Sequence, residues 1–309
     1  MASLQLISNI ISSMQKWCIL AILSISILLS GCASSGSQGS PNSDSSAEYI
    51  ENKGSDTIVN LALAWAEAYE KVDPATRISV TGGGSGTGIT ALINGTVDIA
   101  NASRKIKSEE LEAARANGMD PQEFLIARDA IAVIVNPANP VNHLTLEQVS
   151  RIYTGEIVNW REVGGEDRPI VRLSRETNSG THVYFLESVI RLGNKESKEI
   201  FSANTLLLPS SEGIIAEVSA NPNAIGYDGL GYVTENVKMV GISALDSPDT
   251  FVIPSIETVL DGTYVISRDL FMYTHEVPQG AIKAYLDWIL TPEAQKIVAQ
   301  LGFVPISGN

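Results

Sequence analysis

A glycine-rich stretch at residues 81–90 (TGGGSGTGIT) constrains the fold more than any other feature of this chain. The residues before it, 77–80, alternate in polarity and predict a short strand, and apolar positions within 89–93 predict a short helix. Glycines let backbone N–H groups converge on one point because no Cβ atoms stand in the way, and a helix N-terminus adds further donors. Together with the hydroxyls of Ser85 and Thr87, the stretch predicts an anion site.

Three other glycine-rich motifs fit this stretch less well. A Walker A loop would need a lysine where Ile89 stands. A dinucleotide-binding fingerprint matches at residues 86–91, but Asn94 and the glycine after it end the helix too early for a crossover helix. A nucleophile elbow around Ser85 fails because Thr87 replaces its last glycine. A flexible turn without a ligand remains the open alternative.

Residues 1–31 have the pattern of a secretory signal peptide. Lys16 precedes an apolar run at 17–29 that is too short for a comfortable membrane span. The run leads into LSGC, which resembles the bacterial lipobox, where the chain is cut before the cysteine and the thiol is lipidated. We therefore predict a lipid such as palmitate on Cys32, which would anchor the protein at the extracytoplasmic face of the cell membrane. A plain secreted protein or an uncleaved anchor is the alternative.

Residues 32–47 predict a flexible tether, because their serine, glycine, asparagine, proline and aspartate cannot form a core. Both cysteines of the chain, Cys18 and Cys32, precede the globular body. The body therefore has no disulfide, thiolate metal site or cysteine nucleophile. Its histidines fall in no metal-ligand spacing, so we expect neither a metal nor another cofactor.

Charge and length narrow the classes of function. About 260 residues remain after the tether, enough for two domains. The formal net charge of the chain is −14, and the signal peptide contributes Lys16 and no acidic residue, so the mature protein is more acidic still. This balance disfavours binding to nucleic acid or to an anionic membrane surface. It does not exclude a closed anion site, because backbone dipoles and hydroxyls act locally.

Two further segments repeat the order of strand, hydroxyl-rich turn and helix. A strand at 48–51 precedes Ser55, Asp56 and Thr57, and a helix with apolar positions at helical spacing follows. A strand at 170–173 precedes Arg175, and the turn Ser179-Gly180-Thr181 leads into a helix beginning near His182. An arginine at this place could fork onto a tetrahedral oxyanion. For Ser55 and Asp56, ordinary helix capping is the alternative.

Other strand ends provide further candidates. Ser103 and Arg104 follow a strand at 97–102, and ligands of open α/β sheets sit at such strand ends. Arg104 is a rival to Arg175 as the anion-binding cation, although an ion pair with a neighbour is its more ordinary role. An apolar strand at 130–135 could cross between domains. Helices are also predicted at 144–153, closed by a glycine, and at 281–290 and 292–301.

Several motifs in a fixed order connect these segments with a known family. They are GSDT at 54–57, GGGSGTG at 82–88, NGTVDIA at 94–100, LT at 144–145 with NW at 159–160, SR at 174–175 with SGT at 179–181, and residues 295–305. In this set the chain resembles the phosphate-binding proteins that feed the high-affinity phosphate ABC importer. The resemblance covers essentially the whole mature chain.

The resemblance implies an α/β protein with the two-lobed periplasmic-binding-protein fold, a clamshell that buries phosphate in its cleft. We expect lobe 1 at 48–133 and 266–309, lobe 2 at 134–265, and a hinge of two segments that permits rigid-body closure. Inorganic phosphate and the membrane permease of the importer are the implied partners. We expect a monomeric, non-enzymatic receptor, attached to the membrane only through its lipid.

The resemblance also implies which residues surround the phosphate. To the matching positions we add Ser55, and the expected set is Ser55, Asp56, Thr57, Ser85, Ser103, Arg175, Ser179, Gly180 and Thr181. Arg175 is expected to be the only full positive charge that touches the anion. The best-known family members have an aspartate where Ser103 stands, which accepts the proton of hydrogen phosphate and rejects sulfate.

This departure leaves selectivity open. We hypothesise that Asp56 takes over the acceptor role, with one carboxylate oxygen capping its helix and the other receiving the proton of the ligand. A receptor for another tetrahedral oxyanion, such as sulfate or molybdate, is the alternative within the class. A phosphoester hydrolase is a further alternative, but no metal cluster or nucleophile with a base is found in sequence spacing.

Overall fold

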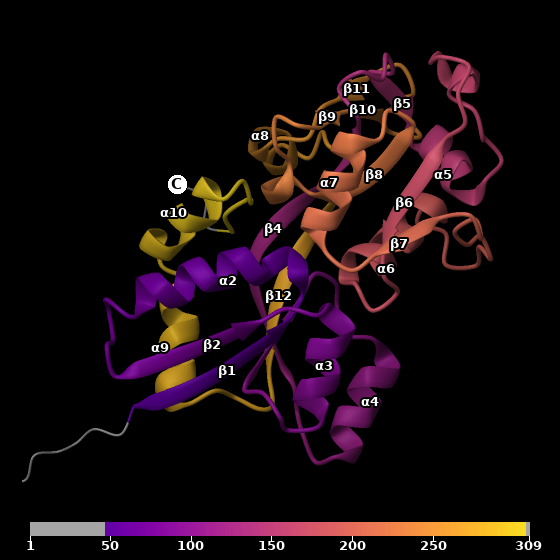
Figure 1. The fold of residues 1–309 in the computed structure, drawn as a ribbon. Coiled ribbons are helices and arrows are strands. Elements are labelled where there is room, and N and C mark those ends of the chain that lie inside the picture. The colour runs from indigo at the N-terminus through magenta and orange to yellow at the C-terminus, as the bar shows by residue number, and fades with distance from the viewer. Residues whose placement is uncertain (1–46, 307–309) are drawn as a thin grey trace, which may run out of the picture. The chain divides into compact units, whose positions relative to one another are not determined.

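The computed structural model describes residues 47–306. The predicted signal peptide, Cys32 and all but the last residue of the predicted tether lie outside the described residues. Within the described range, strands and helices alternate along most of the chain (Figure 1), which makes this an α/β protein as predicted.

The first elements up to the long strand β4 are β1 (Glu48–Gly54), α2 (Asp56–Tyr69), β2 (Thr76–Thr81), α3 (Ser85–Ile93), β3 (Ile99–Ala102), α4 (Ser108–Ala116) and β4 (Gln122–Val135). The middle of the chain forms β5 (His143–Thr145), α5 (Leu146–Thr154), η1 (Trp160–Val163), β6 (Val171–Arg175), α6 (Gly180–Phe185), the π-helix η2 (Leu186–Ile190), β7 (Leu206–Leu208), α7 (Ser211–Ala220) and β8 (Ala224–Gly229). The last elements are η3 (Leu230–Tyr232), β9 (Lys238–Met239), β10 (Gly241–Ser243), β11 (Phe251–Val252), α8 (Ile256–Leu260), β12 (Ser267–Thr274), α9 (Gly280–Ile289) and α10 (Pro292–Gln300).

One nine-stranded sheet has the order β2-β1-β3-β12-β4-β8-β6-β7, with β9 paired to β4. Strand β1 runs parallel to β2 and β3, and β6 runs parallel to β8 and β7. Because the carboxyl ends of parallel strands meet at one edge, the turns after β1 and β3 come together, as do those after β6 and β8. A separate three-stranded sheet has the order β11-β10-β5.

Strand β4 changes its partner along its length. It pairs with β12 from Gln122 to Ala130 and with β8 from Ile131 to Val135 (Figure 1). Strands β1, β2 and β3 lie on the β12 side of this change and form the first half of the sheet, whereas β8, β6 and β7 form the second half. The sequence predicted only 130–135 as a strand, because the residues before it carry polar and charged side chains and lack a continuous apolar run.

Three hydrophobic clusters pack the helices against the sheet. The first packs α2, α9 and α10 against the sheet around Trp65 and Tyr285, and continues to α7. The second packs α5 and α6 on the second half, with Tyr227 stacked on Phe185 at 3.6 Å between ring centroids. The third lies between α3 and β12, around Ile89. Helices cover both faces of this mixed parallel and antiparallel sheet, so central strands such as β3 and β8 are fully buried.

Most predicted helices are found with small shifts at their ends. The helix predicted from residue 144 begins at Leu146, because Leu144 pairs with Ile242 in the small sheet and Thr145 caps the helix by accepting from the N–H of Gln148 at 3.0 Å. It ends at Thr154 and is followed by Gly155, whose φ of 88° is the left-handed conformation that glycine adopts without strain. Among the described residues, no helix has the length and apolarity that a membrane crossing requires.

Candidate functional site

Five hydroxyl groups from four separate segments meet at the strand ends. The hydroxyl of Ser103, just after β3, lies 3.0 Å from that of Ser55 and 3.2 Å from that of Ser85. The backbone N–H of Ser103 also donates to the Ser85 hydroxyl at 3.0 Å. Thr57 and Thr181 complete the group, with their hydroxyl oxygens 2.9 Å apart. We call Ser55, Thr57, Ser85, Ser103 and Thr181 the hydroxyl cluster; each is at most 2 % exposed.

The contact between Thr57 and Thr181 joins the two halves of the sheet, because Thr57 lies in the first turn of α2 and Thr181 belongs to α6. Gly180 approaches the cluster even more closely. A Cβ atom on Gly180 would lie 2.4 Å from the hydroxyl oxygens of both Ser85 and Ser103. Only glycine therefore lets α6 pack at this distance. The structure thus brings together residues that the sequence placed in three separate motifs.

Ser179 has a different role from the cluster. It is the N-cap residue of α6, and its hydroxyl accepts from the N–H of Thr181 at 3.2 Å. It is only 4 % exposed and lies next to Gly180. The structure therefore brings Ser179 to the site, where it fixes the start of α6.

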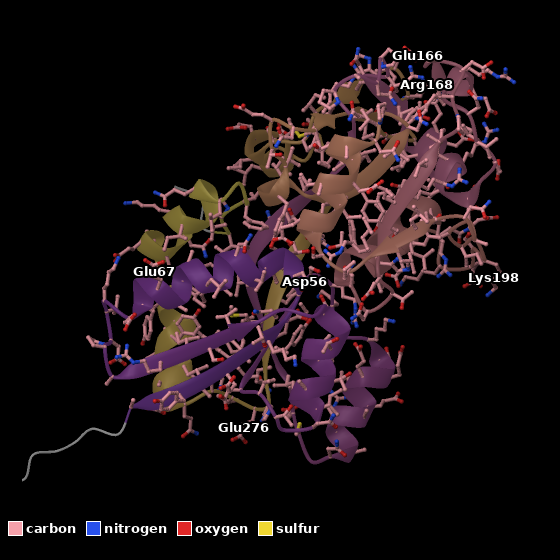
Figure 2. All side chains as sticks on the ribbon, viewed as in Figure 1. Asp56, Glu67, Glu166, Arg168, Lys198 and Glu276 are labelled. Atoms are coloured by element: carbon pink, nitrogen blue, oxygen red, sulfur yellow. The ribbon has the colours of Figure 1, made fainter. Side chains whose placement is uncertain are left out.

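Arg175 is almost completely buried, at 1 % exposed, and links the halves through an ion pair. Its Nη2 donates to Oδ2 of Asp56 at 2.7 Å, and its Nη1 donates to the hydroxyl of Ser211 at 2.8 Å. Figure 2 shows Asp56 at the N-terminal end of α2, whereas Arg175 comes from the end of β6. A guanidinium in this position can donate to a carboxylate and to an oxyanion at the same time.

The expected capping role of Asp56 is wrong. Ser55 occupies the N-cap position of α2 without a side-chain capping bond, and Asp56 is the first residue of the helix. Oδ1 of Asp56 instead accepts from the N–H of Gly83 at 2.7 Å. The side chain turns to the glycine loop because Gly82 leaves room for it, since a Cβ on Gly82 would lie 2.5 Å from Oδ1. Asp56 thus orders the loop and pairs with Arg175.

The structure adds Arg268, which the sequence did not suggest. Nη2 of Arg268 donates to the hydroxyls of Thr57 at 3.2 Å and Thr181 at 3.0 Å, and Nη1 donates to the carbonyl of Ser103 at 3.2 Å. Arg268 is thus a second buried positive charge beside the hydroxyl cluster, whereas the sequence analysis expected Arg175 alone to touch the anion, which stays a prediction. A signal for Arg268 existed in the sequence, because it stands just before the apolar run at 270–273 of β12.

Two buried carboxylates stand behind the arginines. Asp129 on β4 accepts from Nη2 of Arg268 at 2.9 Å, and Asp228 on β8 accepts from the Ser211 hydroxyl at 2.9 Å, with an oxygen 3.7 Å from Nη1 of Arg175. Burial raises the pKa of Asp129 to about 6, although the guanidinium of Arg268 pulls it down. Burial also raises the pKa of Asp228, against the pull of Arg175.

Arg104 makes the neighbouring ion pair that was its ordinary interpretation. Its Nη1 and Nη2 donate to the two carboxylate oxygens of Glu110 at 2.8 and 2.7 Å. Although burial raises the pKa of Glu110, the bonds from Arg104 bring it below its usual value. A pocket of about 510 Å³ opens beside Arg104, and Lys105, Tyr184, Arg268 and Phe271 also line it.

A serine and a histidine do contact each other in the second half. The hydroxyl of Ser174 lies 3.0 Å from Nδ1 of His182 and 2.6 Å from the hydroxyl of Tyr227. Ser174 has no exposed surface, and burial lowers the pKa of His182. The pair is part of the packing around α6. Within residues 47–306, no group of three or more histidine, cysteine, aspartate or glutamate side chains is arranged to hold a metal ion.

Comparison with known proteins identifies the class of fold. A family model described as PBP superfamily domain matches residues 39–293. A crystal structure of a putative phosphate ABC transporter substrate-binding protein from Clostridium perfringens, with bound phosphate, aligns with a TM-score of 0.75 at 35% identity. The alignment covers 84% of this chain and 100% of that chain. These matches define the class as the two-lobed substrate-binding proteins, and they confirm the predicted fold.

Relatives found by sequence narrow the class. The phosphate-binding protein PstS of Pseudomonas aeruginosa (strain PAO1) is 31% identical over 274 residues, which cover 83% of each chain. The phosphate-binding protein PstS of Bacillus subtilis (strain 168) is 30% identical over 288 residues, which cover 91% of this chain and 90% of that one. The chain belongs to the PstS phosphate-binding protein family of the PBP superfamily. The names of these relatives describe binding and not catalysis.

Proposed function

We propose that this protein is an extracytoplasmic receptor that binds inorganic phosphate at the hydroxyl cluster and delivers it to the membrane permease of an ABC importer. The observation that carries the proposal is the convergence of five buried hydroxyls, four of them at positions that the family resemblance indicates, near the buried cations Arg175 and Arg268. The lobes are proposed at 48–133 with 266–309 and at 134–265, near the change of partner along β4.

The chemistry of the cluster suits a dehydrated oxyanion. Burying an anion is costly unless its oxygens receive hydrogen bonds, and bonds to a charged acceptor are about twice as strong as those between neutral groups. Serine and threonine hydroxyls rotate, so the hydroxyls that bond one another can turn their hydrogens to a ligand. Backbone N–H groups at the starts of α2 and α3 add donors that cannot titrate.

Titration calorimetry with the mature protein tests the proposal directly. We expect inorganic phosphate to bind, and sulfate and molybdate to bind much more weakly. If sulfate or molybdate binds more tightly than phosphate, the protein is a receptor for that other oxyanion. If none of these anions binds, the proposed function is wrong.

One observation would fit the hydrolase alternative, namely the contact of Ser174 with His182. A nucleophile must reach its substrate, and Ser174 is fully buried behind Arg175 and Tyr227. We therefore propose that the protein is not an enzyme. An assay for phosphate release from a phosphomonoester should show no activity above background, and release that Ser174→Ala abolishes would contradict this.

Selectivity gives the first variant prediction. An ionised carboxylate has about four acceptor sites, so the bonds from Gly83 and Arg175 leave Asp56 able to accept the proton of hydrogen phosphate. Asp56→Asn should weaken phosphate binding and admit sulfate, because an amide no longer repels a fully ionised anion. Ser103→Ala should change selectivity little, since a hydroxyl can also donate to sulfate. Competition calorimetry with phosphate and sulfate measures both variants.

If the Asp56→Asn protein still binds phosphate tightly and still excludes sulfate, Asp56 only orders the glycine loop. In that case the discrimination lies with another group.

The lipid anchor gives the second prediction, and it concerns a residue outside the described range. Cys32→Ser should move the protein from the membrane fraction into the soluble fraction, because the lipid provides the proposed attachment. Cys18→Ser is the matched control, because residue 18 is proposed to leave with the signal peptide. Fractionation followed by immunoblotting measures both. Retention of the Cys32→Ser protein on membranes would contradict the anchor.

We further propose that the mature receptor acts as a monomer, touches the membrane only through this lipid, and binds no nucleic acid. The net charge of −14 of the whole chain, from which the signal peptide removes only a lysine, supports the last point.

A further inference from the structure

Arg268 stands where β12 and β4 pass between the two halves. Its register partner on β4 is Asp129, and the switch of β4 to its next partner follows two residues later, at Ile131. From this place a single guanidinium reaches one residue of each half. Nη2 contacts Thr57 from α2 and Thr181 from α6, and it also contacts Asp129.

We propose that Arg268 is a second anion-binding cation and that it determines the affinity of the site, with Asp129 as the residue that positions it. The inference rests on the proposed function and deepens it. None of the motifs that carry the family resemblance contains either residue.

Hydrogen-bond directions support this role. Arginine has only donors, so the oxygens of Thr57 and Thr181 must accept from Arg268 at 3.2 and 3.0 Å. Their own hydroxyl hydrogens are then available for other acceptors. One of these two hydrogens forms the 2.9 Å hydrogen bond between the threonines, and the other is available to a ligand. An oxyanion next to them can receive both, from hydroxyls that a positive charge has polarised.

Burial makes the charge effective. The Arg268 side chain is 2 % exposed and that of Asp129 is fully buried, so water screens their interaction with a neighbouring anion very little. Truncating a charged group in such a setting has a large effect on binding, whereas exposed charges change it little.

Asp129 holds Arg268 in place through two bonds. Its Oδ2 accepts from Nε at 3.3 Å and from Nη2 at 2.9 Å, and its Oδ1 accepts from the N–H of Leu230 at 3.2 Å. Gly229 makes room for the carboxylate, because a Cβ there would lie 2.8 Å from Oδ2. The strands β4, β12 and β8 therefore fix the position of this ion pair.

The two residues should respond to substitution with opposite signs. Arg268→Met removes the positive charge and the donors. Asp129→Asn keeps the shape and an amide oxygen that can accept from Arg268, so the guanidinium stays in position. It removes the negative partner of the buried guanidinium, however, which destabilises the ligand-free protein. A bound phosphate then supplies the missing negative charge. If the pair only supported the fold, both variants would lose affinity together.

The test measures phosphate affinity by calorimetry, and melting temperature with and without phosphate, at a pH about two units above the pKa of Asp129. Arg268→Met should weaken phosphate binding by about 10- to 100-fold, the range for losing a hydrogen bond to a charged group. Arg268→Lys, which keeps the charge, should lose less. Without phosphate, the Asp129→Asn protein should melt at a lower temperature than the wild-type protein. It should bind phosphate at least as tightly as the wild-type protein, and phosphate should raise its melting temperature by more.

Arg151→Met is the control, because Arg151 on α5 makes an exposed ion pair with Glu156, which follows the helix. It should bind phosphate like the wild-type protein. The inference is overturned if folded Arg268→Met protein binds phosphate within about twofold of wild type, if Arg268→Lys loses as much affinity as Arg268→Met, or if Asp129→Asn loses affinity in parallel with Arg268→Met. Failure of the wild-type protein to bind phosphate would instead overturn the proposed function, so the two failures are distinct.

Discussion

Replacing Arg175 by alanine should weaken phosphate binding by roughly 2–4 kcal/mol, the range for truncating a buried charge partner. Arg175 is 1 % exposed, and its two terminal nitrogens donate to Asp56 and to Ser211. Its loss removes a positive charge and also leaves the carboxylates of Asp56 and Asp228 without their neighbour. Both would then repel an arriving anion. Calorimetric titration with phosphate measures the effect.

Arg104→Ala is the matched comparison, because Arg104 is also largely buried but pairs with Glu110 through both of its terminal nitrogens. That variant should keep phosphate affinity close to wild type. Circular dichroism must show that both proteins are folded, since a buried aspartate without its partner costs stability. Near-native phosphate affinity in a folded Arg175→Ala protein would contradict the assignment of Arg175 as an anion-binding cation. An equal loss of affinity in Arg104→Ala would assign that role to Arg104 as well.

Gly180→Ala should reduce phosphate affinity by about 10-fold or more, even though it adds a single methyl group, because overpacking a tight site typically costs 1–3 kcal/mol. The new Cβ would stand 2.4 Å from the hydroxyl oxygens of Ser85 and Ser103. Both serines have no exposed surface, so neither can withdraw into solvent. The methyl group must push α6 away from the cluster or turn the hydroxyls out of position.

Gly213→Ala provides the control for this experiment. Residue 213 lies in α7, where an added Cβ would meet its nearest atom, the hydroxyl oxygen of Ser210, at an ordinary 3.5 Å. Alanine favours a helix over glycine, so this variant should be at least as stable as wild type and bind phosphate normally. Unchanged phosphate affinity in Gly180→Ala would show that the close approach of α6 is not needed for binding.

The sequence was informative where the chemistry is local. The glycine loop, the turn at residues 55–57 and the turn at 179–181 each contain their own donors within a few residues, so they could be recognised one at a time. Ser103 was found by a rule about strand ends. That these segments share one cluster follows only from the parallel register of β1 and β3 and from the packing of α6.

The sequence was uninformative where a role depends on a distant partner. Arg268 and Asp129 lie in strands that read as core, and nothing in either segment reveals that they are register neighbours. Asp56 has the residue type and position of an ordinary cap, and only the nearby Gly83 and Arg175 give it a different role. The early part of β4 was missed for a similar reason, because its pairing with β12 stabilises residues whose own composition favours no strand.

The partner switch along β4 has a mechanical consequence. Because the same strand is hydrogen-bonded into both halves, and Ile131 also donates to the carbonyl of Ile266 at 2.8 Å, two adjacent chain segments must bend together whenever one half moves against the other. We expect such a joint to resist sliding and stretching and to permit mainly rotation. Arg268 lies beside this joint, so we expect it to move less than Thr57 and Thr181 when the halves rotate.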